Sequence, residues 1–332
     1  MNNRQVLLAT KKPGIPQSDQ FRIVETPLRD LNDGEILVRN MFLSVDPAMK
    51  GWVADTRDNM SELFEGDVMK AQAVGEVIAS RDDGYVKGEI LVGFFNWQEY
   101  AVITPADVWR RYIETDLPLS LGLGVLGLTG LTAHRALLSL GNPQPGETVL
   151  VSTAAGACGS AVGQIAKLKG CRTIGITGSD AKMAICKSRF GYDEAVNYKS
   201  TDFEAKLGEV CGGSVNIYFD NTAGPVSDAA HQQLAHFARV VICGTASVAN
   251  WNPPPLGPRL ERLILTHRLR IEGFVVFDHM PRPEEAIAEM AAWVREGKLD
   301  YSEDILEGLD SCPDAIAGLY RGDNLGKRII RI

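Results

Sequence analysis

Residues 148–163, which read TVLVSTAAGACGSAVG, decide the fold. An apolar, β-branched run ends in small residues, and a helical pattern follows at once, which is the strand–turn–helix that opens a dinucleotide-binding unit. Small residues let the backbone approach a pyrophosphate, and the helix N-terminus supplies free N–H groups with a partial positive charge. Ala154 stands in place of the usual first glycine, with Gly156 and Gly159 in the other two places. The alternative is an ordinary tight strand-to-helix turn, but the surrounding pattern favours the dinucleotide site.

Strands and helices alternate from this turn onward. We expect helices from the turn to about Lys169 and over Asp180–Phe190, Pro225–Phe237 and Pro283–Glu296. Six buried strands joined by helical crossovers predict an α/β fold with a doubly wound, Rossmann-type parallel sheet. The expected strands are Thr148–Ser152, Arg172–Thr177, Ala195–Tyr198, Val215–Phe219, Arg239–Cys243 and Arg270–Val276.

The N-terminal region follows a different pattern, without regular helices. Strand-like segments at Glu35–Asn40, Ala73–Ser80 and Tyr100–Ile103 are separated by turn residues, which predicts a β-rich domain. We expect the apolar end of the chain, Arg328–Ile332, to return to this domain as a strand. The length of the chain agrees with two domains. The predicted boundaries are 1–125 plus 299–332 for the β-rich domain and 126–298 for the nucleotide-binding domain.

Composition excludes several classes of function. The chain has 332 residues, of which 45% are hydrophobic and 23% charged, as in globular proteins. Its net charge of −8 argues against a nucleic-acid partner or an anionic membrane surface. No apolar run reaches the roughly 18 residues that span a bilayer, and the N-terminus shows no signal peptide, so we expect a cytoplasmic enzyme.

Cysteine and histidine are distributed unevenly. The six cysteines begin at Cys158 and the five histidines at His134, so the first 130 residues contain neither thiolate nor imidazole. Because these are the usual zinc ligands, we expect no metal site in the N-terminal domain. The scattered cysteines, without framework spacing, suit a reducing compartment.

Five further motifs are spread over nearly the whole chain. A β-rich domain, an inserted nucleotide domain and a returning C-terminus together resemble the medium-chain dehydrogenase/reductase superfamily, whose catalytic domain is GroES-like. The motifs are similar to those of its zinc-independent leukotriene B4 12-hydroxydehydrogenase, prostaglandin reductase and alkenal double-bond reductase group. They are LSVDP at 43–47, FNWQEY at 95–100, LGLTGLTA at 126–133, DNTAG at 220–224 and GDNLGK at 322–327.

The resemblance implies an activity and a partner. It implies that NADPH reduces the C=C bond of a small α,β-unsaturated aldehyde or ketone, with hydride added at the β-carbon and a proton at the α-carbon, without a metal. It also implies a homodimer formed through the nucleotide domains. Two other readings of the chain are a zinc-free NADPH quinone reductase and a non-catalytic NADPH-binding sensor. Alcohol oxidation is harder to reconcile with a chain that lacks a metal and an obvious general base.

The end of the second strand bears on the choice between NAD and NADP. Asp180 lies near the spacing at which an NAD enzyme binds the ribose 2′-OH, but Ser179-Asp180 is also typical of a helix start. Gly178 leaves space for a phosphate, and Lys182 offers it a positive charge. In the resembled family, the lysine at this place and the tyrosine matching Tyr198 bind the 2′-phosphate. We therefore expect NADP, the alternatives being a solvated lysine and a packed tyrosine.

Other cofactor contacts follow from the same resemblance. Thr132, Asn221 and Asn324 match positions near the phosphates, the carboxamide or the nicotinamide ribose, although helix capping, turn capping and loop hydrogen bonding are alternative roles. Cys158 could also be a redox thiol at the helix N-terminus, but packing is the simpler role. The remaining expected contacts are Ala155, Gly156, Ala157, Cys158, Gly159, Cys243, Phe274 and Val276.

The chain departs from the family at the catalytic centre. Ala48 and Lys50 stand where the family often has tyrosine and arginine, and Ala249 stands where many members have a tyrosine that orients the carbonyl or relays a proton. Water, the ribose 2′-hydroxyl or another side chain would then replace that phenol, and Ser247 is the candidate. We expect a substrate pocket between the domains, for whose aromatic residues core packing is an equal alternative. Its expected residues are Ala48, Lys50, Trp52, Trp97, Trp251 and Phe277.

Overall fold

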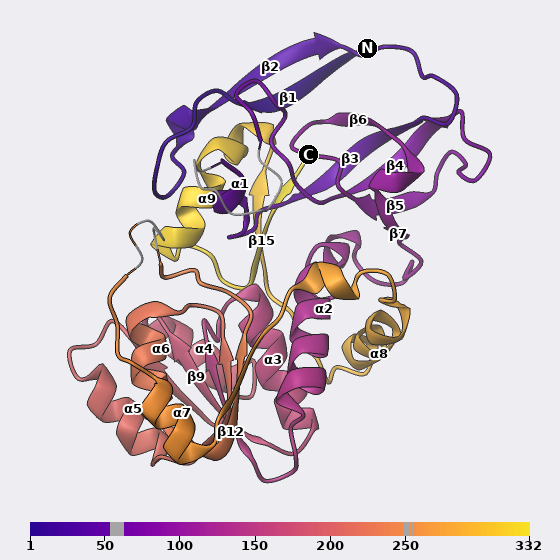
Figure 1. The fold of residues 1–332 in the computed structure, drawn as a ribbon. Helices are drawn as coiled ribbons and strands as arrows, with labels where there is room; N and C mark the ends of the chain where they lie inside the picture. Colours follow the sequence, from indigo (N-terminus) through magenta and orange to yellow (C-terminus); the bar gives the residue numbers. More distant parts are fainter. Residues whose placement is uncertain (54–62, 249–252, 254) are drawn as a thin grey trace. The chain divides into compact units, whose positions relative to one another are not determined.

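The chain divides into two compact units (Figure 1). The structure is a computed structural model that describes residues 1–53, 63–248, 253 and 255–332. The β-rich unit comprises Met1–Gly124 and Glu303–Ile332, and the α/β unit comprises Val125–Ser302. The sequence prediction placed the two boundaries after residues 125 and 298.

A six-stranded parallel sheet forms the centre of the α/β unit, which confirms the expected doubly wound fold. The strand order is β10-β9-β8-β11-β12-β13, so the direction of winding reverses between β8 and β11. In such sheets, ligands bind outside the carboxyl ends of the strands at this switch point. The strands are β8 (Thr148–Ser152), β9 (Arg172–Thr177), β10 (Glu194–Asn197), β11 (Val215–Asp220), β12 (Leu234–Ile242) and β13 (Arg270–Gly273).

Helices connect these strands. α3 buries Val162, Ile165 and Ala166, as its amphipathic pattern predicts, and it packs on β8 and β9. The described helices of this unit are α2 (Leu128–Arg135), the π-helix η4 (Ala136–Gly141), α3 (Ala157–Leu168), α4 (Asp180–Ser188), α5 (Phe203–Cys211), α6 (Gly224–His231), α7 (Glu261–His267), the 3-10 helix η5 (Val276–His279) and α8 (Glu284–Arg295).

The largest differences from the predicted elements of this unit lie around β12, β13 and α5. The helix expected to run to Phe237 ends at His231, and β12 already begins at Leu234. Phe237 has φ +64° and lies where the pairing of β11 with β12 shifts register, so this irregular strand lacks the alternation by which strands are found. The last strand ends at Gly273 rather than at residue 276, and α5 was not predicted.

The β-rich unit contains a seven-stranded sheet and a separate hairpin. β15 pairs antiparallel with β3, with Ile330 opposite Leu43, which confirms that the end of the chain returns to this unit. Its strands are β1 (Asn2–Leu8), β2 (Phe21–Pro27), β3 (Ile36–Ser44), β4 (Ala73–Ser80), β5 (Ile90–Gly93), β6 (Tyr100–Ile103), β7 (Val108–Arg111), β14 (Glu303–Glu307) and β15 (Lys327–Arg331). Its described helices are α1 (Met49–Val53), α9 (Cys312–Arg321) and the 3-10 helices η1 (Ser18–Gln20), η2 (Pro105–Asp107), η3 (Leu119–Gly122) and η6 (Leu309–Ser311).

Candidate functional site

The turn between β8 and α3 is built on close backbone approach. Thr153 has φ +55°, and Gly156 and Gly159 fold back over it. A Cβ on Gly159 would lie 2.3 Å from the carbonyl oxygen of Thr153, and a Cβ on Gly156 would lie 2.8 Å from its Cγ2. No side chain fits at Gly159 without moving the backbone. The turn therefore opens the first N–H groups of α3, on Ala157 and Cys158, toward the carboxyl end of the sheet.

Tyr192 supports this turn from behind, and sequence reasoning missed it. Its hydroxyl donates to the carbonyl oxygen of Gly159 at 2.6 Å, and the side chain is buried. A Cβ on Gly163 would lie 2.2 Å from Tyr192 Cζ, and a Cβ on Gly175 would lie 2.7 Å from the Cβ of Ala154. The glycines inside α3 and β9 were the sequence signal for such a close neighbour.

The two cysteines of this region have raised pKa values. Burial raises the pKa of Cys158 to about 12, in spite of its place in the first turn of α3. Burial also raises the pKa of Cys243, which follows β12. A thiolate nucleophile needs a lowered pKa, so the structure supports packing rather than redox chemistry at Cys158.

The start of α4 arranges the groups expected at the ribose. The Ser179 hydroxyl accepts the backbone N–H of Lys182 at 3.3 Å, so Ser179 is the N-cap of the helix. The Asp180 carboxylate accepts the side-chain N–H of Asn197 at 2.9 Å. Asp180 is thereby engaged with β10, which weakens the argument for it as a partner of a ribose 2′-OH.

Tyr198 lies beside Gly178. A Cβ on Gly178 would lie 3.2 Å from Tyr198 Cε1, and the Tyr198 N–H donates to the Thr177 carbonyl at 2.9 Å. The tyrosine ring is exposed, and the half-buried Lys182 lies on the helix that follows Gly178. The ends of β9 and β10 thus bring Gly178 and Tyr198 together, just before the helix that carries Lys182.

Ser152 and Asn221 connect the two central strands at the switch point. The Asn221 N–H donates to Ser152 Oγ, and its side-chain amide donates to the Ser152 carbonyl, both at 2.8 Å. Because β8 and β11 are neighbours, these bonds fix Asn221 at the carboxyl edge of the sheet. One amide hydrogen and the amide oxygen of Asn221 take no part in these two bonds.

The ends of β12 and β13 complete this edge. The Cys243 N–H donates to the Asp220 carbonyl at 2.8 Å, and the Phe274 N–H donates to the Ile242 carbonyl at 2.9 Å. The buried Phe274 ring stacks on His279, with 4.6 Å between centroids and 15° between planes. Val276 begins η5, in which Phe277 is partly exposed.

The hydroxyls of Thr132 and Ser247 both form hydrogen bonds with backbone carbonyls. Thr132 Oγ1 donates to the carbonyl of Leu128 at 2.8 Å on α2, the helix that packs on α3. Ser247 Oγ lies 2.8 Å from the carbonyl oxygens of both Thr222 and Ala223. In this geometry the Ser247 proton is directed at protein carbonyls.

Several expected residues belong to the β-rich unit. The Asn324 side chain donates to the Gly326 carbonyl at 2.8 Å. Ala48 is exposed, and Lys50 Nζ lies 5.5 Å from the ring centroid of Tyr320. Burial lowers the pKa of Lys50, and Tyr320, which sequence reasoning missed, donates its hydroxyl to the Pro47 carbonyl at 3.0 Å.

The tryptophans differ from the expectation of a pocket wall. Trp97 is fully buried and donates its indole N–H to the Ser44 carbonyl at 3.0 Å, so its side chain has no exposed surface in this unit. Trp52 is 5% exposed and lies under Lys70, whose Nζ is 5.7 Å from the ring centroid. Trp251 and Ala249 lie outside the described residues.

Lys327 is a third residue that sequence reasoning missed. The ammonium is buried and donates to Ser44 Oγ at 2.7 Å, to the Val45 carbonyl at 3.0 Å and to Asp46 Oδ1 at 2.5 Å. Three acceptors satisfy its three donors, as a buried charge requires. The last strand thereby fixes the segment that leads into Ala48.

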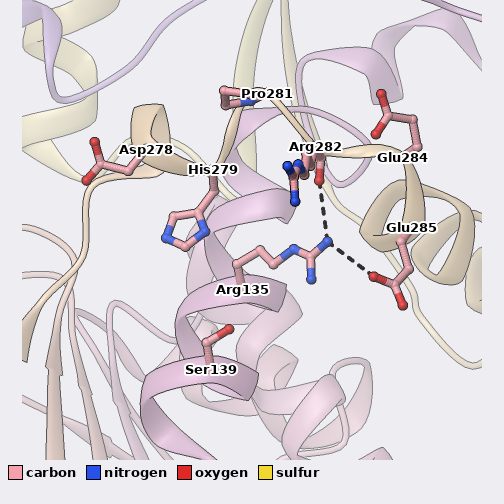
Figure 2. A pocket seen from close by; sticks show the side chains of 8 residues that line it. All are labelled: Arg135, Ser139, Asp278, His279, Pro281, Arg282, Glu284 and Glu285. Carbon is pink, nitrogen blue, oxygen red and sulfur yellow. Dashed lines mark hydrogen bonds and ion pairs between the residues drawn. The ribbon is translucent and has the colours of Figure 1, made fainter.

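A cavity of about 610 Å³ opens on another part of the α/β unit (Figure 2). The Arg135 guanidinium donates to the Arg282 carbonyl at 3.4 Å and lies 3.6 Å from the Glu285 carboxylate. The expected cofactor and substrate residues are not among its lining residues, although His279 links it to Phe274. It is lined by Arg135, Ser139, Asp278, His279, Pro281, Arg282, Glu284 and Glu285.

The described part of the chain offers three further observations. Among residues 1–53, 63–248, 253 and 255–332, no three His, Cys, Asp or Glu side chains are grouped as a metal ion would require. No helix within these ranges is both long and apolar enough to cross a membrane. All six cysteines are free.

Comparison with known proteins extends these observations. Residues 4–110 match a family described as the N-terminal domain of oxidoreductase, and residues 157–295 match one described as zinc-binding dehydrogenase. The chain is 36% identical over 335 residues to the NADPH-dependent curcumin reductase of Escherichia coli, covering 99% of this chain and 97% of the relative. It is 39% identical over 322 residues to prostaglandin reductase 1 of Sus scrofa, covering 96% and 95%.

A solved structure supports the same relationship. CurA from Vibrio vulnificus in complex with NADPH superimposes with a TM-score of 0.91 at 36% identity. The superposition covers 99% of this chain and 98% of that one. The likeness therefore extends over both units.

Proposed function

Because the chain belongs to the medium-chain dehydrogenase/reductase superfamily, in the group of the prostaglandin, curcumin and 2-alkenal reductases, we propose that it is an NADPH-dependent double-bond reductase. Its substrates are small α,β-unsaturated aldehydes and ketones, which it reduces at the C=C bond without a metal. The observation that carries the cofactor assignment is the arrangement of Gly178, Ser179, Lys182 and Tyr198 beside an Asp180 that is engaged with β10.

The residues present fit NADPH. Gly156 and Gly159 keep the turn free of side chains where a pyrophosphate approaches, and the N-terminus of α3 offers its N–H groups. Lys182 and Tyr198 would hold the 2′-phosphate, with the charge of Lys182 as the main attraction. Thr132 and Asn221 would position the nicotinamide ribose and carboxamide, and we extend the same role to Asn324. The other contacts that we propose are Ala155, Ala157, Cys158, Cys243, Phe274 and Val276.

When bound, NADPH supplies the hydride for the β-carbon of the substrate. The chain's own contribution is position and electrostatics. Hydrogen-bond donors must face the carbonyl oxygen, where negative charge develops, and the α-carbon must receive a proton. The carboxyl edge between β8 and β11 would hold the nicotinamide in place for hydride transfer, because Ser152 holds Asn221 through two bonds. We propose that Ala48, Lys50 and Phe277 contact the substrate.

The test follows NADPH oxidation at 340 nm with 2-alkenals, enones, simple quinones and saturated aldehydes, and repeats each with NADH. Mass spectrometry of the products should give saturated carbonyls, with NADPH preferred over NADH. Faster turnover of quinones than of enals would replace this proposal with a quinone reductase. NADPH binding without turnover of any compound would replace it with a sensor.

We also propose a homodimer formed through the α/β unit. In the described part of this unit β13 is one of the two edge strands of the sheet, paired on one side with β12. An edge strand is a ready surface for association with a second copy. Light scattering should give twice the chain mass of 36.1 kDa, and a monomer would contradict the proposal.

A further inference from the structure

Ala223, just before α6, has a backbone conformation that residues with a side chain rarely adopt. Its φ is +56° and its ψ is −166°, in a region essentially restricted to glycine. Gly224 follows with φ +63°. Such strain persists only where the surroundings determine the conformation from several sides. The contacts of the Ala223 peptide groups therefore need an explanation.

The Asp220 carboxylate holds the amino side of Ala223. Its Oδ1 accepts the N–H of Ala223 at 3.0 Å and the N–H of Thr222 at 2.8 Å. The same carboxylate is buried and accepts the hydroxyls of Tyr218 at 3.0 Å and Ser227 at 2.6 Å. Because β11 and α6 both anchor it, Asp220 is a fixed acceptor for the turn.

Ser247 holds the carbonyl side. Its hydroxyl lies 2.8 Å from the carbonyl oxygens of Thr222 and Ala223, and its N–H donates to Thr222 at 2.9 Å. The packing is close, because a Cβ on Gly224 would lie 2.7 Å from Ser247 Oγ. One hydroxyl proton shared between two carbonyls is committed to the turn.

The same loop also contacts Asn221. The Ala246 N–H donates to the Asn221 carbonyl at 3.3 Å, and a Cβ on Gly244 would lie 2.8 Å from that oxygen. We propose that Ser247 is a positioning residue that, with Asp220, clamps the strained Ala223 peptide and so sets Asn221 for the cofactor. The inference rests on the proposed NADPH site for its functional consequence, but the clamp itself does not require the cofactor.

The test is a double-mutant cycle of Ser247→Ala and Ala223→Gly. The Kd for NADPH is measured by fluorescence, kcat with a 2-alkenal, and the thermal midpoint without ligand. Loss of the hydroxyl should weaken NADPH binding about three- to tenfold, with kcat changed less than about twofold. In the Ala223→Gly background the same loss should change Kd by less than about twofold, because glycine adopts this conformation without a clamp.

Two controls match the variants. Ser188→Ala removes an exposed hydroxyl from α4, and Ala246→Gly adds a glycine to the same loop at a residue without positive φ. Ser188→Ala should not weaken NADPH binding as Ser247→Ala does. Ala246→Gly should not cancel the effect of Ser247→Ala on the Kd, as Ala223→Gly should. Additive effects of Ser247→Ala and Ala223→Gly on Kd would overturn the clamp. So would an unchanged Kd with a lower kcat in both backgrounds, which would instead make Ser247 a proton donor.

The thermal midpoint separates this inference from the proposed function. Ser247→Ala should lower it by about 2–4 °C, and Ala223→Gly should abolish that decrease. If the wild-type protein binds no NADPH while this cancellation holds, the proposed function fails and the clamp stands. If NADPH binds and the changes in thermal midpoint caused by the two substitutions are additive, the clamp fails and the proposed function stands.

Discussion

The two ends of the carboxyl edge of the sheet are built in different ways. At β8 and β9 the site consists of backbone, with Gly156, Gly159 and Gly178 leaving room and helix N-termini supplying donors. At β11 and β12 it consists of side chains, with the Asp220 carboxylate and the Ser247 hydroxyl fixing a strained turn. The first end depends on atoms being absent, whereas the second depends on hydrogen bonds being present.

The difference implies two kinds of sensitivity. Where backbone segments lie in contact, as in the β8–α3 turn, a single added carbon disrupts the structure because it clashes with neighbouring atoms. A turn made by a buried carboxylate fails when acceptors are removed, because each orphaned donor keeps its desolvation penalty. Substitutions at the two ends should therefore differ in the size of their effects and in which second substitution restores function.

Asp220→Ala should have the largest effect. It removes the carboxylate that accepts from the buried hydroxyls of Tyr218 and Ser227 and from the N–H groups of Thr222 and Ala223, although the two hydroxyls still lie 3.0 Å from each other. We expect the free energy of unfolding to fall by about 4 kcal/mol, measured by urea titration. Asp228→Ala, on the same helix as Ser227, is the control and should change it by less than about 1 kcal/mol. A loss as small as the control's would show that the carboxylate does not hold the turn.

Gly159→Ala should have the next largest effect. The added Cβ would lie 2.3 Å from a backbone oxygen, so the turn or α3 must move. We expect about 2–3 kcal/mol less stability together with weaker NADPH binding. Gly208→Ala in α5 serves as the control, because a Cβ there meets only the Gln233 side chain at 3.8 Å and its φ is not positive. If both variants unfold at the same urea concentration, the close backbone contact at Gly159 does not determine the structure of the β8–α3 turn.

The same contrast explains what the sequence predicts. The β8–α3 turn, the start of α4 and the alternating strands have local patterns, so residues 148–163 and 178–182 could be interpreted directly. Tyr192 and Lys327 could not, because their partners are distant in sequence and a tyrosine or lysine has no pattern of its own. The register shift at Phe237 hid the start of β12 for a related reason, since a bulge breaks the alternation.

The aromatic residues show a further limit of local patterns. A tryptophan motif at 95–100 is equally compatible with a pocket wall and with a core. Only the three-dimensional packing shows that Trp97 is buried against Phe21, at 5.9 Å between ring centroids. The hydrogen bonds of the Ser247 hydroxyl could not be predicted either, because its carbonyl partners lie on another loop.

Lys182→Ala sharpens the comparison, because it removes a positive charge at the start of α4. Removing the charge that we propose for the 2′-phosphate should raise the KM for NADPH about tenfold and leave the KM for NADH nearly unchanged. Lys187→Ala is the control, because this lysine lies on the same helix but pairs with Glu194 at 2.9 Å. Equal effects of Lys182→Ala on both cofactors would remove Lys182 from the phosphate site.

The smallest expected effect concerns the Cys158 thiol in the first turn of α3. The pKa of Cys158 is about 12 in the folded chain, against an ordinary value of 9.0. Below pH 9 both states keep the proton. As the pH rises above 9, the unfolded chain releases its proton while the folded chain does not, so the free energy of unfolding decreases.

This decrease can be assigned by comparing Cys158→Ala with the wild-type chain in urea titrations at pH 7.5 and pH 10. The variant should lose less stability between the two pH values, whatever its stability at pH 7.5, because one thiol with a raised pKa no longer titrates. Cys186 and Cys211 remain in both chains, and burial raises the pKa of each to about 12, so the variant should still lose some stability. An identical decrease in both chains would mean that Cys158 titrates alike in the folded and unfolded states. The α3 N-terminus and solvent would then offset burial, and the thiol would be available for reaction at moderately alkaline pH.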